Sequence, residues 1–237
     1  MSLPRTDAEM DMNSKSHRHG FTLIELLVVI TVIAILMALL FPAFKGVQDQ
    51  AKRTQAKNDV TQIVTAVNAY YTEYGKMAVD STKQGFDTLA GDPNGSYDNH
   101  LIFDALRAIA DADWNAGNVL NPKQIVFFSG NNVKDAANPR AGFATQDATV
   151  NGVPIKTNAF VDPWGGEYLV SVDSNYDNWT AQFFAYTDLT YTSKDSGGSP
   201  WQSVQATATA SSWGKDNKFG TNGDSKFKDS DDVISWQ

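Results

Sequence analysis

An uninterrupted apolar stretch from Phe21 to Phe44 dominates the pattern of hydrophobic and polar positions, and it follows the polar segment 1–20. Its only ionisable residue is Glu25. The residues from Phe21 to Phe41 span about 30 Å as a helix, at roughly 1.5 Å per residue, which matches a bilayer core of about 30 Å. Helices of soluble proteins rarely stay apolar all round for this length. The pattern therefore predicts a membrane-spanning helix.

An amphipathic pattern follows Pro42. Apolar residues recur there at spacings of three and four, at Val47, Ala51, Val60, Ile63, Val64, Val67, Tyr70, Tyr71 and Tyr74. Gly75 then supplies a stop signal. We predict one helix from Phe21 to Tyr74, with 21–44 in the membrane and 45–75 packed on a globular head. Pro42 is expected to kink or locally melt it, because proline removes a backbone hydrogen bond and clashes with the preceding turn.

The head, 76–237, has short apolar runs separated by Gly, Asn, Asp and Ser, which indicates strands and loops. The expected elements are a helix at Phe103–Ala112, a strand at Gln124–Phe128, paired strands at Glu167–Val172 and Ala181–Tyr186, and loops at 129–160 and Asp195–Ser203. The predicted fold class is α+β, in which the long N-terminal helix packs on a small antiparallel sheet with loop insertions.

Charge and composition exclude several classes of function. The formal net charge of −8 argues against nucleic acid as a partner. The chain has no cysteine and three histidines, which leaves almost nothing for a thiolate site, a His-rich zinc site or a Ser-His-Asp triad. Lys15 and Arg18 precede the apolar run, so the N-terminus is expected in the cytoplasm. A secretory signal peptide also begins with basic residues, with a shorter apolar core and a small-residue cleavage site after it. Ala43 and Gly46 follow the apolar run, so composition leaves this alternative open, and the position of Glu25 and the resemblance below argue against it.

The segment from Gly20 to Val29, GFTLIELLVV, resembles the cleavage and methylation motif of type IV pilins and type II secretion pseudopilins. The resemblance implies a pilin fold and a leader, 1–20. It also implies that a prepilin peptidase cuts between Gly20 and Phe21 and methylates Phe21.

Glu25 lies one turn into the apolar helix, where a carboxylate is costly without a partner. In the family, the N-terminal amine of the neighbouring subunit is thought to be that partner, which sets docking and register. Pilin-like proteins often have a proline at the position of Pro42, where a break lets the helix bend or stretch during assembly.

Two head motifs resemble the major pseudopilin of type II secretion. The first is AYYTEYG, residues 69–75, followed by DPWGGEY, residues 162–168. Asp-Pro initiates a turn, the glycines permit positive φ, and the aromatic residues supply core area.

The second motif is the tail, 213–236, which resembles the calcium loop of that family. Ca²⁺ binds six to eight oxygens in a flexible loop. The closest matches to the family's ligands are Asp216, Asp231 and Asp232, and the further candidates are Asn217, Asn222 and Asp224. Asn217 replaces the usual glycine, and the segment between the two ends is longer and carries lysines. The alternative is a solvated acidic tail, and the spacing excludes an EF-hand.

The leading hypothesis is therefore a pseudopilin of a type II secretion system, a structural subunit and not an enzyme. Its expected partners are other copies of itself, other pseudopilins, the prepilin peptidase and an inner-membrane assembly platform. The chain would cross the bacterial inner membrane once, with a periplasmic head that enters a periplasmic filament. One alternative is a type IV pilin for adhesion, motility or DNA uptake. A membrane-tethered enzyme or carbohydrate-binding module, using the scattered tryptophans, is a third.

Overall fold

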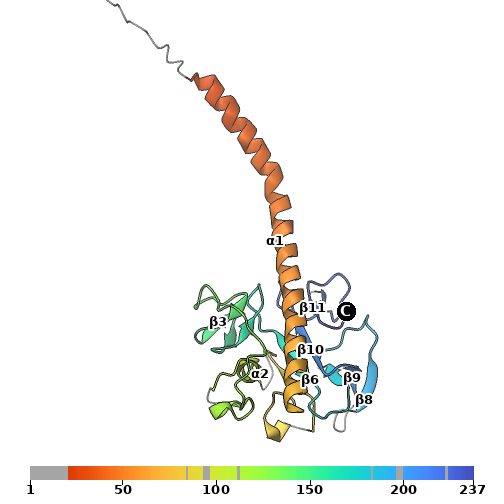
Figure 1. The fold of residues 1–237 in the computed structure, drawn as a ribbon. Helices are drawn as coiled ribbons and strands as arrows, with labels where there is room; N and C mark the ends of the chain where they lie inside the picture. Colours follow the sequence, from red (N-terminus) through yellow and green to blue (C-terminus); the bar gives the residue numbers. More distant parts are fainter. Residues whose placement is uncertain are drawn as a thin grey trace, which may run out of the picture. The chain divides into compact units, whose positions relative to one another are not determined.

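The computed structural model describes residues 21–83, 85–92, 97–110, 113–182, 184–195, 200–221 and 224–237. The chain divides into two compact units, one ending at Val47 and the other comprising Gln48–Gln237. Helix α1 (Leu23–Tyr74) supplies the described helix of the first unit and opens the second (Figure 1). A long N-terminal helix followed by antiparallel sheets confirms the predicted α+β class.

The part of α1 within the second unit buries one face. Ala56, Val60, Ile63, Val67 and Tyr70, at alternating spacings of four and three, have no exposed surface. Residues with this spacing lie on one side of a helix, so the amphipathic pattern in the sequence is the face that meets the core.

The end of α1 also follows the prediction. Gly75 adopts a φ of 65°, and its N–H donates to the Tyr71 carbonyl at 2.8 Å. Glycine adopts this left-handed conformation without a steric penalty from a Cβ atom, which is why it ends helices.

The buried face of α1 packs on a four-stranded antiparallel sheet in the order β1-β6-β10-β11. These strands are β1 (Thr88–Ala90), β6 (Leu169–Val172), β10 (Ala208–Ser212) and β11 (Val233–Ile234). Val170 pairs with Ala90 on one side and with Ala210 on the other. In Figure 1, β6, β10 and β11 lie beside this part of α1.

Shorter elements complete the second unit. The helical ones are η1 (Ser81–Lys83), α2 (His100–Leu106) and η2 (Ala116–Asn118). The strands form β2 (Gly142–Phe143) with β5 (Phe160–Val161), β3 (Ala148–Val150) with β4 (Val153–Ile155), and a three-stranded sheet β7-β9-β8 of Thr180–Gln182, Pro200–Val204 and Thr192–Asp195.

The predictions for the first part of the head need correction. The helix expected at Phe103–Ala112 is α2, which begins earlier and ends before Ala108 takes a φ of 58°; Asp111 and Ala112 lie outside the described residues. Gln124–Phe128 is not a strand. Its last two N–H groups, those of Phe127 and Phe128, both donate to the Leu106 carbonyl. The end of α2 thus supplies the hydrogen-bond acceptor that a neighbouring strand would otherwise provide.

The later strands are also arranged differently. β6 lies within the first of the two segments predicted to pair, and β7 overlaps only the first two residues of the second, but β6 and β7 belong to different sheets. The predicted loop 129–160 contains three short strands and the first residue of β5, and Asp195–Ser203 includes much of β9. Runs of two to five residues carry too little periodicity to identify a strand, and pairing depends on contacts distant in sequence.

Three buried asparagines hold the irregular region around α2 together. Asn99, Asn115 and Asn121 are at most 1% exposed. Asn121 Nδ2 donates to the carbonyls of Ala105 and Ile125, and its Oδ1 accepts from the Tyr74 hydroxyl at 2.6 Å. A side-chain amide both donates and accepts, so it satisfies backbone groups that no sheet or helix pairs.

Candidate assembly segment and C-terminal loop

The start of α1 is capped by its own first turn. The Thr22 N–H and hydroxyl donate to Glu25 Oε2 at 2.8 and 2.7 Å, and the Glu25 N–H donates to Thr22 Oγ1 at 3.2 Å. These reciprocal bonds form a capping box, which satisfies donors that have no partner within a helix. Glu25 is thus held at the beginning of the helix. Gly20 lies outside the described residues.

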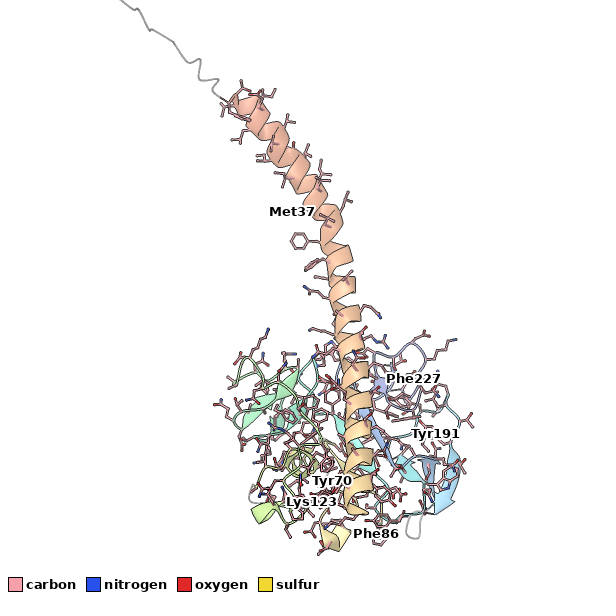
Figure 2. The ribbon with its side chains drawn as sticks, in the orientation of Figure 1. Met37, Tyr70, Phe86, Lys123, Tyr191 and Phe227 are labelled. Atoms are coloured by element: carbon pink, nitrogen blue, oxygen red, sulfur yellow. The ribbon has the colours of Figure 1, made fainter. Side chains whose placement is uncertain are left out.

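The first part of α1 exposes apolar side chains on all sides. Between Leu23 and Phe41 every large apolar residue is at least 47% exposed, and Met37 is labelled among them in Figure 2. The best window of this helix has a mean hydropathy of 3.0 and none of it is buried. α1 is therefore long and apolar enough to cross a membrane, by length and composition.

Pro42 lies inside α1, and the backbone is helical on both sides of it. Proline has no N–H, so this position cannot donate to the carbonyl four residues earlier. The weak point that the sequence predicts at this position stays a prediction.

The DPWGGEY segment forms a tight turn around one buried carboxylate. Asp162 Oδ1 accepts the N–H groups of Trp164, Gly165 and Gly166 at 2.8, 2.7 and 3.0 Å. Its Oδ2 accepts the Ser212 hydroxyl at 2.5 Å, which ties the turn to β10. A carboxylate that takes three backbone donors fixes the turn, and this explains why Asp and two glycines stand in this order.

Glu167, the next acidic residue of this segment, is also buried, but its carboxyl accepts fewer hydrogen bonds than that of Asp162. Its Oε2 accepts the Asn99 N–H at 3.0 Å, and burial raises its pKa to about 7. An unfolded Glu has a pKa of about 4.3. The folded state therefore holds this proton more tightly, and the resulting stability is present below about pH 4 and is lost as the pH rises through about 7.

We accordingly expect the melting temperature of the chain in detergent to fall between pH 5 and pH 8 in the presence of a chelator. Glu167→Gln cannot ionise and should reduce that slope. Asp147→Asn is the matched control, because its exposed carboxyl has a pKa of about 2 and does not titrate in this window. An identical slope in wild type and Glu167→Gln would contradict the assignment.

The two ends of the predicted calcium loop meet in the structure. Asp231 Oδ2 accepts the N–H groups of Lys215 and Asp216, the latter at 3.0 Å. Asp232 Oδ2 accepts the Tyr186 hydroxyl at 2.8 Å and the Gly220 N–H at 2.7 Å. Asp232 Oδ1 is buried and has no hydrogen-bond partner among the described residues.

Burial, together with the charges of Asp231 and Asp216, raises the pKa of Asp232 to about 7. A buried carboxylate oxygen beside two other carboxylates is a position that a cation would stabilise.

The other ligand candidates are placed differently. Asp224 Oδ1 accepts the Lys226 N–H, and Asn222 lies outside the described residues. Asn217 has a φ of 53°, and its Oδ1 lies 2.8 Å from the position that a Cβ atom on Gly166 would take. Within the described part of the chain, no three His, Asp or Glu side chains are grouped as metal ligands. The donor set thus fits Ca²⁺ only with further oxygens from backbone carbonyls, and calcium binding stays a prediction.

Sequence reasoning missed three features. The Thr-x-x-Glu spacing of Thr22 and Glu25 signals a capping box and was available in the sequence. The contact of Asn217 with the turn at Gly166 had no local signal, because the two residues are distant in the chain. The third feature is the buried Asn99, and no local signal in the sequence indicates that it belongs to the core.

Comparisons with known proteins agree with the N-terminal motif. The family of the prokaryotic N-terminal methylation motif matches residues 15–41. The chain is 39% identical over 82 residues to type II secretion system core protein G of Pseudomonas aeruginosa, covering 35% of this chain and 56% of that protein. It is 34% identical over 91 residues to fimbrial protein EcpC of Eikenella corrodens, covering 38% and 58%.

A third relative is type IV major pilin protein PilA of Myxococcus xanthus, at 33% identity over 76 residues, covering 32% of this chain and 34% of that protein. The chain therefore spans little more than half the length of the first two relatives. No solved structure matches it.

Proposed function

We propose that this chain is a filament subunit of a type II secretion system, a pseudopilin that supports protein export. The observation that carries the proposal is the methylation motif joined to a helix whose apolar residues are exposed on all sides. Such a helix requires a lipid environment or the matching helices of other subunits. The chain is a structural subunit and catalyses no reaction.

Before assembly, the chain is anchored in the bacterial inner membrane by a single crossing, with its N-terminus in the cytoplasm and its head in the periplasm. The prepilin peptidase removes 1–20 and methylates Phe21. The assembly platform then extracts the subunit into a periplasmic filament with other copies and other pseudopilins. Glu25 guides docking, and Pro42 gives the helix a place to bend.

The test of function is deletion of the gene in its own host. We expect exported proteins to accumulate in the periplasm while surface pili and twitching motility stay normal. The second candidate, a type IV pilin, is favoured by the similarity to a fimbrial protein and to a major pilin. It requires the opposite result, with loss of surface pili and normal export.

Processing gives a separate prediction. Intact-mass analysis of the membrane-extracted protein should show loss of residues 1–20 and one added methyl group on Phe21. Gly20→Ala should leave most of the protein unprocessed, because bulk at the cleavage site hinders the peptidase. Ser16→Ala, four residues earlier in the same leader, is the control and should be processed normally. A mature chain that keeps its leader in cells containing the peptidase would contradict the proposal.

Calcium binding by 213–236 belongs to the same proposal, and the partnerless Asp232 Oδ1 supports it. A ligand that binds only the folded state adds about 2.7 kcal/mol at about 100 times its Kd. For a domain of this size, calcium should therefore raise the melting temperature by about 5–10 °C. Magnesium should do less, because it accepts fewer and more rigid protein ligands.

Asp216→Asn is the variant of choice, because Asp232 also holds Tyr186 and Gly220 and its loss would perturb the fold directly. We expect it to remove most of the calcium-dependent shift. Asp147→Asn, an exposed carboxylate paired with Lys156, should keep the full shift. Absence of any shift in the wild type would identify the tail as a solvated acidic end.

A further inference from the structure

A groove of about 380 Å³ lies in the second unit, outside the assembly segment. It is formed by the β3–β4 hairpin, the turn at Gly165–Glu167, two segments that flank β1 and α2, and Asn217 of the tail. Apart from Asn217, a candidate calcium ligand, the proposed function above uses none of it. Its two sides differ in chemistry, and that difference indicates what it can bind.

One side of the groove is acidic. Glu167 is 8% exposed, and Asp92 and Asp98 line the groove beside it. Glu167 Oε2 is held by the Asn99 N–H, whereas Oε1 is buried and has no hydrogen-bond partner among the described residues. Such an oxygen is costly unless a donor from outside the chain reaches it.

The other side is apolar. Val153 and Pro154 of β4 line it, the first half-buried and the second exposed, whereas Val150 and Ile155 are 5% and 1% exposed and contribute little surface. Lys156 also lines the groove, but its Nζ lies 3.2 Å from Asp147 Oδ2, where the two side chains form an ion pair. The groove therefore offers an aliphatic wall that leads to a carboxylate.

We propose that this groove binds the side chain of a lysine residue from a partner polypeptide. The lysine stem lies along Val153 and Pro154, and its ammonium group donates to Glu167 Oε1. Lysine buries its methylene stem on apolar surface while its charged end reaches a partner. A charge-assisted hydrogen bond to a buried carboxylate is also among the stronger ones.

The geometry favours lysine over two other cations. Arginine recognises a carboxylate with two parallel hydrogen bonds, and Glu167 has only Oε1 available because Oε2 is bound to Asn99. A divalent metal needs a set of oxygen ligands. The described residues contain no group of three acidic or histidine side chains placed for a metal, and the hairpin wall adds no charged ligand.

The test uses the full chain in detergent micelles at pH 8 and low ionic strength, with calorimetry or ligand-observed NMR. The probe is Nα-acetyl-lysine N-methylamide, and the matched apolar probe is Nα-acetyl-norleucine N-methylamide. We expect the lysine probe to bind at least tenfold more tightly. Glu167→Gln should weaken it at least tenfold, because the amide keeps the shape and removes the charge.

Glu73→Gln is the control, because it makes the same chemical change on α1, where Glu73 pairs with Lys123. It should leave binding unchanged. If Glu167→Gln disturbs the fold, Asp98→Asn at the half-buried edge of the groove should still reduce binding. Equal affinity for the two probes would overturn the proposal. So would displacement of the lysine probe by calcium chloride in a manner lost in Glu167→Gln, which would identify a metal site.

Discussion

A chain in which Glu25 is replaced by alanine is expected to enter the membrane normally and to form at least tenfold fewer filaments. A carboxylate in the apolar part of a bilayer is disfavoured without a partner, so its removal does not hinder insertion. In the proposed filament, however, the same carboxylate pairs with the N-terminal amine of a neighbouring subunit. Immunoblots of the sheared filament fraction and of the membrane fraction measure the two effects.

The capping box makes a sharper experiment possible. Alanine at position 25 removes both the charge and the bonds to Thr22, and loss of a cap costs about 1 kcal/mol. Glutamine also serves in a capping box. Glu25→Gln therefore removes the charge alone and should assemble as poorly as Glu25→Ala. Thr22→Ala weakens the cap alone and should assemble better than either. Normal assembly of Glu25→Gln would mean that the cap, and not the charge, is what assembly needs.

The sequence predicts α1 well because the signals for it are local. The apolar run, the spacing of three and four from Val60 to Tyr70, and the stop at Gly75 each act within a few residues, and α1 ends at Tyr74 as expected. Hydrophobic periodicity over many turns leaves little room for another interpretation.

The strands of the head were predicted less well because their partners are remote. β6 pairs with β1, about 80 residues earlier, and with β10, about 40 residues later. Nothing within the segment 167–172 distinguishes these partners from the nearer β7. Ser171 does reach β7, but through its hydroxyl, which donates to the Ala181 carbonyl at 3.0 Å.

The same contrast between local signals and distant contacts applies to the candidate site. The local motif predicts the cleavage site and the role of Glu25, and both stay predictions. The Asp162 turn confirms the reasoning from Asp-Pro and paired glycines. The ligands of the tail are harder to predict. Its Asp and Asn residues stand in similar local sequence, but their side chains lie in different surroundings in the structure. Asp232 enters the interior, whereas Asn217 lies against Gly166. Only the packing of the tail on the turn at Gly166 distinguishes the environment of Asp232 from that of Asn217.

In the sequence, the asparagines of the head indicate loops, but Asn99 is a core residue. Replacing it with alanine is expected to destabilise the chain by about 4 kcal/mol. Its Nδ2 donates to the carbonyls of Phe160 and Tyr168 at 2.8 and 2.9 Å, and its Oδ1 accepts the Phe160 N–H at 3.0 Å. Alanine would leave the Phe160 N–H and the Tyr168 carbonyl without partners, at roughly 1–3 kcal/mol each. The Phe160 carbonyl keeps the Tyr168 N–H at 3.2 Å.

The melting temperature of the chain in detergent, followed by tryptophan fluorescence, should accordingly fall by about 8–16 °C, at about 2–4 °C per kcal/mol for a domain of this size. Asn68→Ala is the matched control, because Asn68 is exposed on α1 and alanine favours a helix there. It should leave the melting temperature unchanged or slightly higher. An equally small effect of Asn99→Ala would show that water replaces the lost amide, and that the Phe160–Tyr168 segment holds its place on the sheet without this side chain.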